Sequence, residues 1–172
     1  MKPSALLLTP ALTLSLALSL RPRDGPTTHK AWSGTPAAVG DMVQFRFRPF
    51  NHTVTQPAGA GAPCSPMDVK GIKAGAAMAP INSDFVPGAT EADKEVPVFN
   101  VQVASADPIY LYCGQPPHCN LGMVMVISPK SDDDVKAFEA AAKAQDRPTR
   151  PRALLPAEPW GTIAAGEAIV PP

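Results

Sequence analysis

The chain has 172 residues and no formal net charge at pH 7, because 15 Lys and Arg balance 15 Asp and Glu. This length accommodates one domain of about 100–150 residues with irregular ends. The balanced charge, with no basic cluster interleaved with aromatic residues, excludes the electrostatic footprint of a nucleic-acid-binding protein, so we expect no nucleic-acid partner.

The N-terminal residues 1–20 place one lysine ahead of a long apolar run and end in small residues, which is typical of a secretory signal peptide. A membrane anchor is the alternative, but Pro10 and several Ser and Thr weaken a run that is barely long enough to cross a bilayer. The C-terminal sequence lacks the hydrophobic tail of a lipid-anchor signal. We therefore expect a secreted, extracellular product without stable membrane insertion.

Residues 21–37 are broken by Pro and Gly and show no apolar period, so we expect an irregular leader, either coil or a degraded first strand. Residues 38–146 contain the periodic elements. Apolar and polar residues alternate over residues 43–48 and again over residues 99–103, which predicts two strands with one buried face each.

Two further short strands are predicted around the cysteine-rich region, at residues 108–113 and 122–129. The intervening residues 56–96 are rich in Pro, Gly and Ala and indicate a surface loop with at most a short helical turn. Several short strands separated by turn residues, together with 22 prolines, predict an all-β fold of the antiparallel sandwich or barrel kind.

A short helix is predicted after Ser131, which is a suitable N-cap and is followed by three aspartates that complement the helix dipole. We expect this helix to pack on the end of the domain. Residues 147–172 are proline-rich and aperiodic, and we expect them to form a disordered tail.

The residues that carry chemistry are Cys113, His118 and Met123, each separated from the next by four residues. Thiolate and imidazole together select copper or zinc, and two histidines and a cysteine with a weak axial methionine describe a blue-copper site. Zinc is the main competitor, but it has no use for a thioether. His52, just past a strand end, supplies the second imidazole, whereas His29 lies in the irregular leader and is left out.

The third sulfur has a separate role. Cys119 cannot easily share a metal with His118, because adjacent residues of an extended segment point in opposite directions. It is free to pair with Cys64, which leaves Cys113 as the unpaired thiol. A free thiol is a liability in an oxidising compartment, and a bound metal would protect it.

The segments NHTV, PCSP and YCGQPPHCNLGM, the last followed by a hydrophobic strand and a proline, resemble the cupredoxins. The resemblance covers about residues 38–140, and it is to the secreted fungal cupredoxin-like proteins called extracellular serine-rich proteins and to the plant phytocyanins. It implies a Greek-key β-sandwich or barrel with a short C-terminal helix and a cupredoxin-like domain at residues 38–146. It further implies copper ligands and a disulfide at these positions: His52, Cys113, His118 and Met123 for copper, and Cys64 with Cys119 for the disulfide.

The chain departs from the family's pattern in two places. Only the short stretch TTHKAWSGTPAA stands where a full first strand is usual, which predicts a missing or ragged edge of the sandwich. The serine-rich stalk and the lipid anchor usual in such fungal proteins are not found in this sequence either, so the sequence does not predict wall attachment.

Two functions fit this pattern. The first is a secreted type 1 copper protein that acts as a single-electron carrier, as a monomer with an unidentified redox partner protein; Met123 would help to set its potential and His118 would be the exit for the electron. The second is an extracellular structural or interaction module of the same fold that has lost copper or merely sequesters it. The sequence shows no nucleophile–base pair, carboxylate dyad or open metal position, so we do not expect an enzyme.

Asn51 begins the glycosylation sequon Asn51-His52-Thr53. A sugar there would crowd the neighbouring ligand His52. We expect Asn51 instead to connect the two ligand segments by hydrogen bonding, as outer-shell groups do around such metals.

Overall fold

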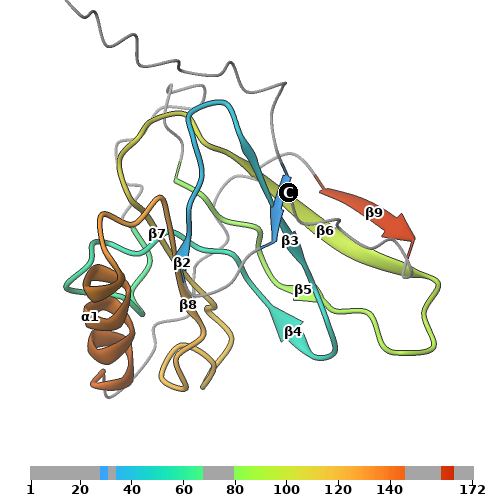
Figure 1. Ribbon diagram of the computed structural model, residues 1–172. Coiled ribbons are helices and arrows are strands. Elements are labelled where there is room, and N and C mark those ends of the chain that lie inside the picture. The colour runs from blue at the N-terminus through green and yellow to red at the C-terminus, as the bar shows by residue number, and fades with distance from the viewer. Residues whose placement is uncertain (1–27, 31–33, 68–79, 146–159, 165–172) are drawn as a thin grey trace, which may run out of the picture.

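The computed structural model describes residues 28–30, 34–67, 80–145 and 160–164. Within these residues the protein is mostly β, with several small sheets and one helix that follows the last strand of the central region (Figure 1). The predicted signal peptide, residues 1–20, lies outside the described residues. Within the described part of the chain, no helix combines the length and the apolar character needed to cross a bilayer.

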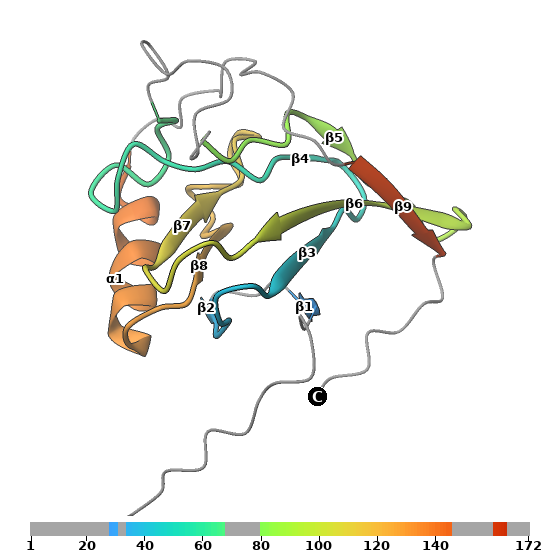
Figure 2. The ribbon, with the colours of Figure 1, turned by 90° about the horizontal axis from the view of Figure 1, so that it is seen from above.

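The elements are, in chain order, β1 (Thr28–Lys30), β2 (Gly34–Thr35), β3 (Met42–Arg46), β4 (Asn51–His52), β5 (Val86–Pro87), β6 (Glu95–Gln102), β7 (Ile109–Tyr112), β8 (Val124–Ile127), α1 (Asp132–Lys143) and β9 (Trp160–Ala164). One sheet has the order β1-β3-β6-β9, a second has the order β2-β8-β7, and β4 pairs with β5. The pairs β1–β3 and β2–β8 are parallel, and the other pairs are antiparallel. Figure 2 shows α1 beside β7 and β8, on the opposite side of the molecule from β9.

The main core contains buried residues from both larger sheets. Val43 of β3 pairs with Val101 of β6, and both pack in one buried cluster with Leu111 of β7 and Ile127 of β8. The alternation that predicted these strands therefore reflects burial of one face of each strand. The predicted strands at β3, β6, β7 and β8 are confirmed.

The helix α1 forms where the sequence predicts it. Ser131 is the N-cap, and its hydroxyl oxygen accepts a hydrogen bond from the Asp134 amide at 3.2 Å. The buried face of the helix presents Phe138, whose ring centroid lies 4.9 Å from that of Tyr110 on β7. Ala142 is fully buried as well. The helix therefore covers the β7–β8 end of the domain, which carries the candidate ligand loop.

For the leader the structure shows short strands, the second of the two predicted alternatives, whereas the prediction of a disordered tail is wrong in part. The leader at residues 21–37 contains β1 and β2, which pair with β3 and β8. The tail at residues 147–172, predicted to be disordered, contains β9, which pairs with β6. These strands are two to five residues long and are held by partners that are distant in sequence, so local periodicity could not reveal them.

The segment 56–96 is only partly a surface loop. It contributes β5, and Val86 of that strand is buried in the main core. Asn82 and Ser83 are buried too, with 2 % of their surface exposed. Residues 68–79 of this segment lie outside the described residues. The buried part runs beside the segment that carries His52, because β5 pairs with β4 and Asn82 forms a β-bridge with Thr55.

Candidate metal centre

Three of the predicted ligands meet at one place. His52 ends β4, Cys113 directly follows β7, and His118 lies between β7 and β8. The Cys113 Sγ lies 3.8 Å from His52 Nδ1 and 3.4 Å from His118 Nδ1. All three donor atoms lie within 4.8 Å of one another, and the two imidazole ring centroids are 4.9 Å apart.

These distances suit a single metal ion. Metal–nitrogen bonds of about 2.0–2.1 Å and metal–sulfur bonds of about 2.3 Å, at trigonal angles, put sulfur and nitrogen donors roughly 3.6–3.8 Å apart. The observed distances of 3.8 and 3.4 Å lie close to this range. Two imidazoles and one thiolate are the equatorial donors of a blue-copper site. The residues present therefore fit copper in both geometry and donor chemistry.

Met123 is held beside these ligands. It lines the same cavity of about 730 Å³ as His52, Cys113 and His118. Its amide donates to the His118 carbonyl at 2.9 Å, and its carbonyl accepts from the Cys113 amide at 3.0 Å. The preceding Gly122 has a φ of +90°, a conformation that favours glycine, and it turns the chain so that Met123 rejoins the ligand loop.

Both histidines turn their Nδ1 atom towards the Cys113 sulfur. The Nε2 of His52 lies 3.0 Å from the carbonyl oxygen of Pro49, which can only accept a hydrogen bond. In the neutral imidazole this contact assigns the proton to Nε2 and leaves the lone pair of Nδ1 facing Cys113. Burial lowers the pKa of His118, and the neighbouring His52 lowers it further. Both effects favour the neutral, ligating form of the His118 imidazole.

Cys113 is buried, with 3 % of its surface exposed. Burial raises the pKa of its thiol, while hydrogen bonds from the backbone of Thr53 and Gln115 lower it to a smaller extent. The Thr53 amide donates to Cys113 Sγ at 3.4 Å. A metal would therefore displace a proton from this thiol on binding.

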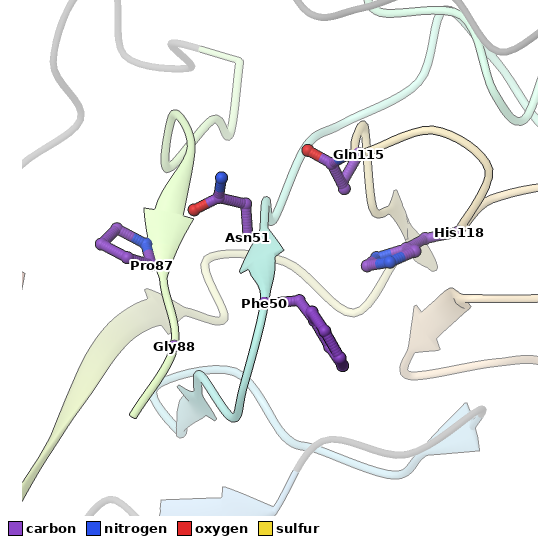
Figure 3. Close-up of a pocket in the computed structure, with 6 residues that line it drawn as sticks. All are labelled: Phe50, Asn51, Pro87, Gly88, Gln115 and His118. Atoms are coloured by element: carbon purple, nitrogen blue, oxygen red, sulfur yellow. The ribbon is translucent and has the colours of Figure 1, made fainter. Parts of the chain in front are cut away.

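The link between the two ligand segments comes from Thr53. The Gly114 amide donates to Thr53 Oγ1 at 2.7 Å, in addition to the bond between the Thr53 amide and the Cys113 sulfur. Asn51, to which we assigned this role, is exposed. Its side chain instead helps to line an open cavity of about 380 Å³ next to His118, together with Gln115 and Phe50 (Figure 3).

The predicted disulfide is confirmed. Cys64 and Cys119 are bonded, with their Cα atoms 5.8 Å apart, and both are fully buried. Cys113 is the free cysteine of the three. Because Cys119 directly follows His118, the disulfide fixes the end of the ligand loop against the rest of the domain.

A comparison with curated proteins finds a similarity to a cupredoxin. Over 107 residues the chain is 32 % identical to a protein named "Probable GPI-anchored cupredoxin-1" from Arthroderma benhamiae. This similarity supports membership of the cupredoxin superfamily. The aligned region covers 62 % of this chain and 48 % of the relative, so the chain spans about half the length of the curated relative that it matches. No family model matches, and neither does any solved structure.

The sequence interpretation missed the groups around the ligands. Thr53, Thr55 and Asn82 are buried and hydrogen-bonded to one another beside Cys113. The only local signal for the threonines is their alternation after His52, which places them on the same side of the chain. Asn82 belongs to a segment that the composition assigned to a surface loop, and nothing local to it points to the site.

Proposed function

We propose that the chain is a type 1 copper protein that carries single electrons outside the cell, built on a Greek-key cupredoxin sandwich with a C-terminal helix. His52, Cys113 and His118 hold the metal as equatorial ligands, and Met123 is the weak axial ligand. The observation that carries the proposal is the approach of the Cys113 sulfur to Nδ1 of both histidines, at 3.8 and 3.4 Å.

Copper bound here would supply a one-electron redox couple, and the chain's own residues define its surroundings. The buried Cys113 and its amide donor from Thr53 limit access of water to the sulfur. His118 is partly exposed and lines the open cavity next to Phe50 and Gln115. The electron would leave through the imidazole of His118, the ligand that lies nearest to this open surface.

The surface around His118 suits a transient redox partner protein. Phe50 and Leu121 are 80 % and 73 % exposed, and Met123 is 44 % exposed. Exposed apolar residues of this kind mark interaction surfaces. We propose that the chain is a monomer that docks its partner here, and that it is not an enzyme, because four protein ligands leave no position for a substrate on the metal.

The proposed role places the protein outside the cell or at the cell surface, and two observations support this location. The relative is named as GPI-anchored, and a buried disulfide is typical of proteins that fold in an oxidising compartment. In an oxidising compartment a free thiol such as that of Cys113 is prone to oxidation, and a bound metal would protect it.

Titration of the secreted chain with Cu(II) tests the proposal. We expect an intense visible sulfur-to-copper band at one equivalent, which is lost in Cys113→Ser and in His52→Ala. His29→Ala is the matched control, since that histidine is not among the proposed ligands, and it should keep the band. A folded, colourless wild-type protein would instead support the structural or interaction module.

A further inference from the structure

A line of hydrogen bonds runs from the metal centre into the domain. The Gly114 amide donates to Thr53 Oγ1 at 2.7 Å, Thr53 Oγ1 lies 2.8 Å from Thr55 Oγ1, and Thr55 Oγ1 donates to Asn82 Oδ1 at 3.1 Å. Thr53, Thr55 and Asn82 are 5 %, 0 % and 2 % exposed. Water therefore cannot easily replace any bond of this line, and breaking one leaves a buried polar group unsatisfied.

The direction of this line is fixed by its two ends. The Gly114 amide can only donate, and Asn82 Oδ1 can only accept. The carboxamide of Asn82 is itself oriented by Asp84, because its Nδ2 donates to Asp84 Oδ1 at 3.2 Å and its Oδ1 accepts from the Asp84 amide at 3.3 Å. Each threonine hydroxyl thus accepts from the Gly114 side and donates towards Asn82.

The backbone holds the same three segments together. Thr55 exchanges two hydrogen bonds with Tyr112, at 3.0 and 2.9 Å, directly before Cys113. On its other side, the Val54 amide donates to Ser83 Oγ at 2.8 Å and the Ser83 amide donates to the Val54 carbonyl at 3.0 Å. Residues 53–55 therefore lie between residues 82–84 and residues 112–114.

We propose that Asn82 is a positioning residue for the metal centre. By accepting from Thr55, it sets the orientation of both threonine hydroxyls and so holds the Gly114 amide. Gly114 is bonded covalently to Cys113, and Thr53 follows His52, so the line fixes two ligands relative to each other. The consequence for metal affinity rests on the proposed function, whereas the effect on Gly114 does not.

Two variants break the line at different points. Thr55→Val removes one hydroxyl and nearly preserves the side-chain shape, and Asn82→Ala removes the terminal acceptor while leaving both threonines in place. Thr55→Ser restores the hydroxyl and is the rescue variant. Thr35→Val is the matched control, because Thr35 is another buried threonine, on β2, that is not a member of the line.

Hydrogen exchange and amide chemical shifts of Gly114, measured by NMR on the metal-free chain, give the first readout. We expect exchange about tenfold faster, relative to the Leu111 amide, in Thr55→Val and Asn82→Ala, with wild-type behaviour in Thr55→Ser and Thr35→Val. On the same variants we expect Cu(II) affinity to fall about tenfold, the lower end of what loss of an outer-shell partner costs.

Each outcome has a distinct meaning. If Gly114 exchanges as in wild type in both line-breaking variants, or equally fast in Thr35→Val, the positioning role is overturned. It is also overturned if wild type binds Cu(II) and Thr55→Val binds it equally well. If wild type binds no Cu(II), the proposed function fails, and the Gly114 exchange alone decides the role of Asn82. Should Thr55→Val not fold, Asn82→Ala decides the matter, because it retains the Thr55–Tyr112 backbone pairing.

Discussion

Removal of the disulfide should destabilise the domain strongly. The bond joins Cys64 to Cys119, 55 positions apart in the sequence, so it constrains a long loop in the unfolded chain. The chain-entropy relation for a loop of this length gives a loss of about 4 kcal/mol in the free energy of unfolding at 25 °C. A domain of this size has only about 5–15 kcal/mol in total, so the double variant Cys64→Ala/Cys119→Ala should be marginally stable.

The assay is equilibrium unfolding in urea, followed by circular dichroism on the metal-free chain. The wild-type protein treated with a reductant should agree with the double variant to within about 1 kcal/mol, since both lose the same constraint. We also expect the double variant to bind Cu(II) more weakly, because Cys119 directly follows His118. A loss of less than about 1 kcal/mol would refute the view that this bond is a principal constraint on the fold.

Three further predictions concern the thiol, the helix and a glycine. Burial raises the pKa of Cys113, so copper must displace the proton of the metal-free thiol at neutral pH. The Cu(II) affinity should therefore rise about tenfold per pH unit between roughly pH 7 and 8. An affinity that does not change with pH in a competition titration would contradict this. Ser131→Ala should lower the free energy of unfolding by about 1 kcal/mol in urea, and an unchanged value would exclude a capping role. In Gly88→Ala the new Cβ would lie 1.5 Å from the Arg48 carbonyl oxygen, so we expect a loss of about 3 kcal/mol or failure to fold, whereas Gly59→Ala, with open space around it, should match wild type.

The central strands could be predicted because the residues that specify them lie within the strands themselves. In β3 and β6, apolar residues alternate with polar ones and one face packs in the core. The two-residue repeat of the sequence therefore matches the burial seen in the structure. The helix could be predicted from Ser131 and the three aspartates that follow it. In both cases the residues that specify the element lie within it.

The short strands β1, β2 and β9 could not be predicted in this way. Each depends on a partner that is distant in sequence: β1 on β3, β2 on β8 and β9 on β6. Strands of two to five residues carry little periodicity of their own. For the same reason, composition alone assigned residues 56–96 to a surface loop, although Val86 is part of the core.

Some residues of the candidate site could likewise be predicted from the sequence, and others could not. His52, Cys113 and His118 could be predicted to converge because their side chains are uncommon and their chemistry is specific, and the structure brings their donor atoms together. Thr53 and Asn82 are common residue types. Their relation to Cys113 depends on three segments packing side by side, which only the folded chain reveals.

X-ray absorption at the copper edge, on the chain loaded with one equivalent of Cu(II), tests the central claim most directly, because it reports which atoms touch the metal. We predict one sulfur and two imidazole nitrogens in the first shell of the wild-type site, with the sulfur absent in Cys113→Ser. A first shell made only of nitrogen and oxygen in the wild-type protein would contradict the assignment of Cys113, His52 and His118 as the ligands of a type 1 copper centre.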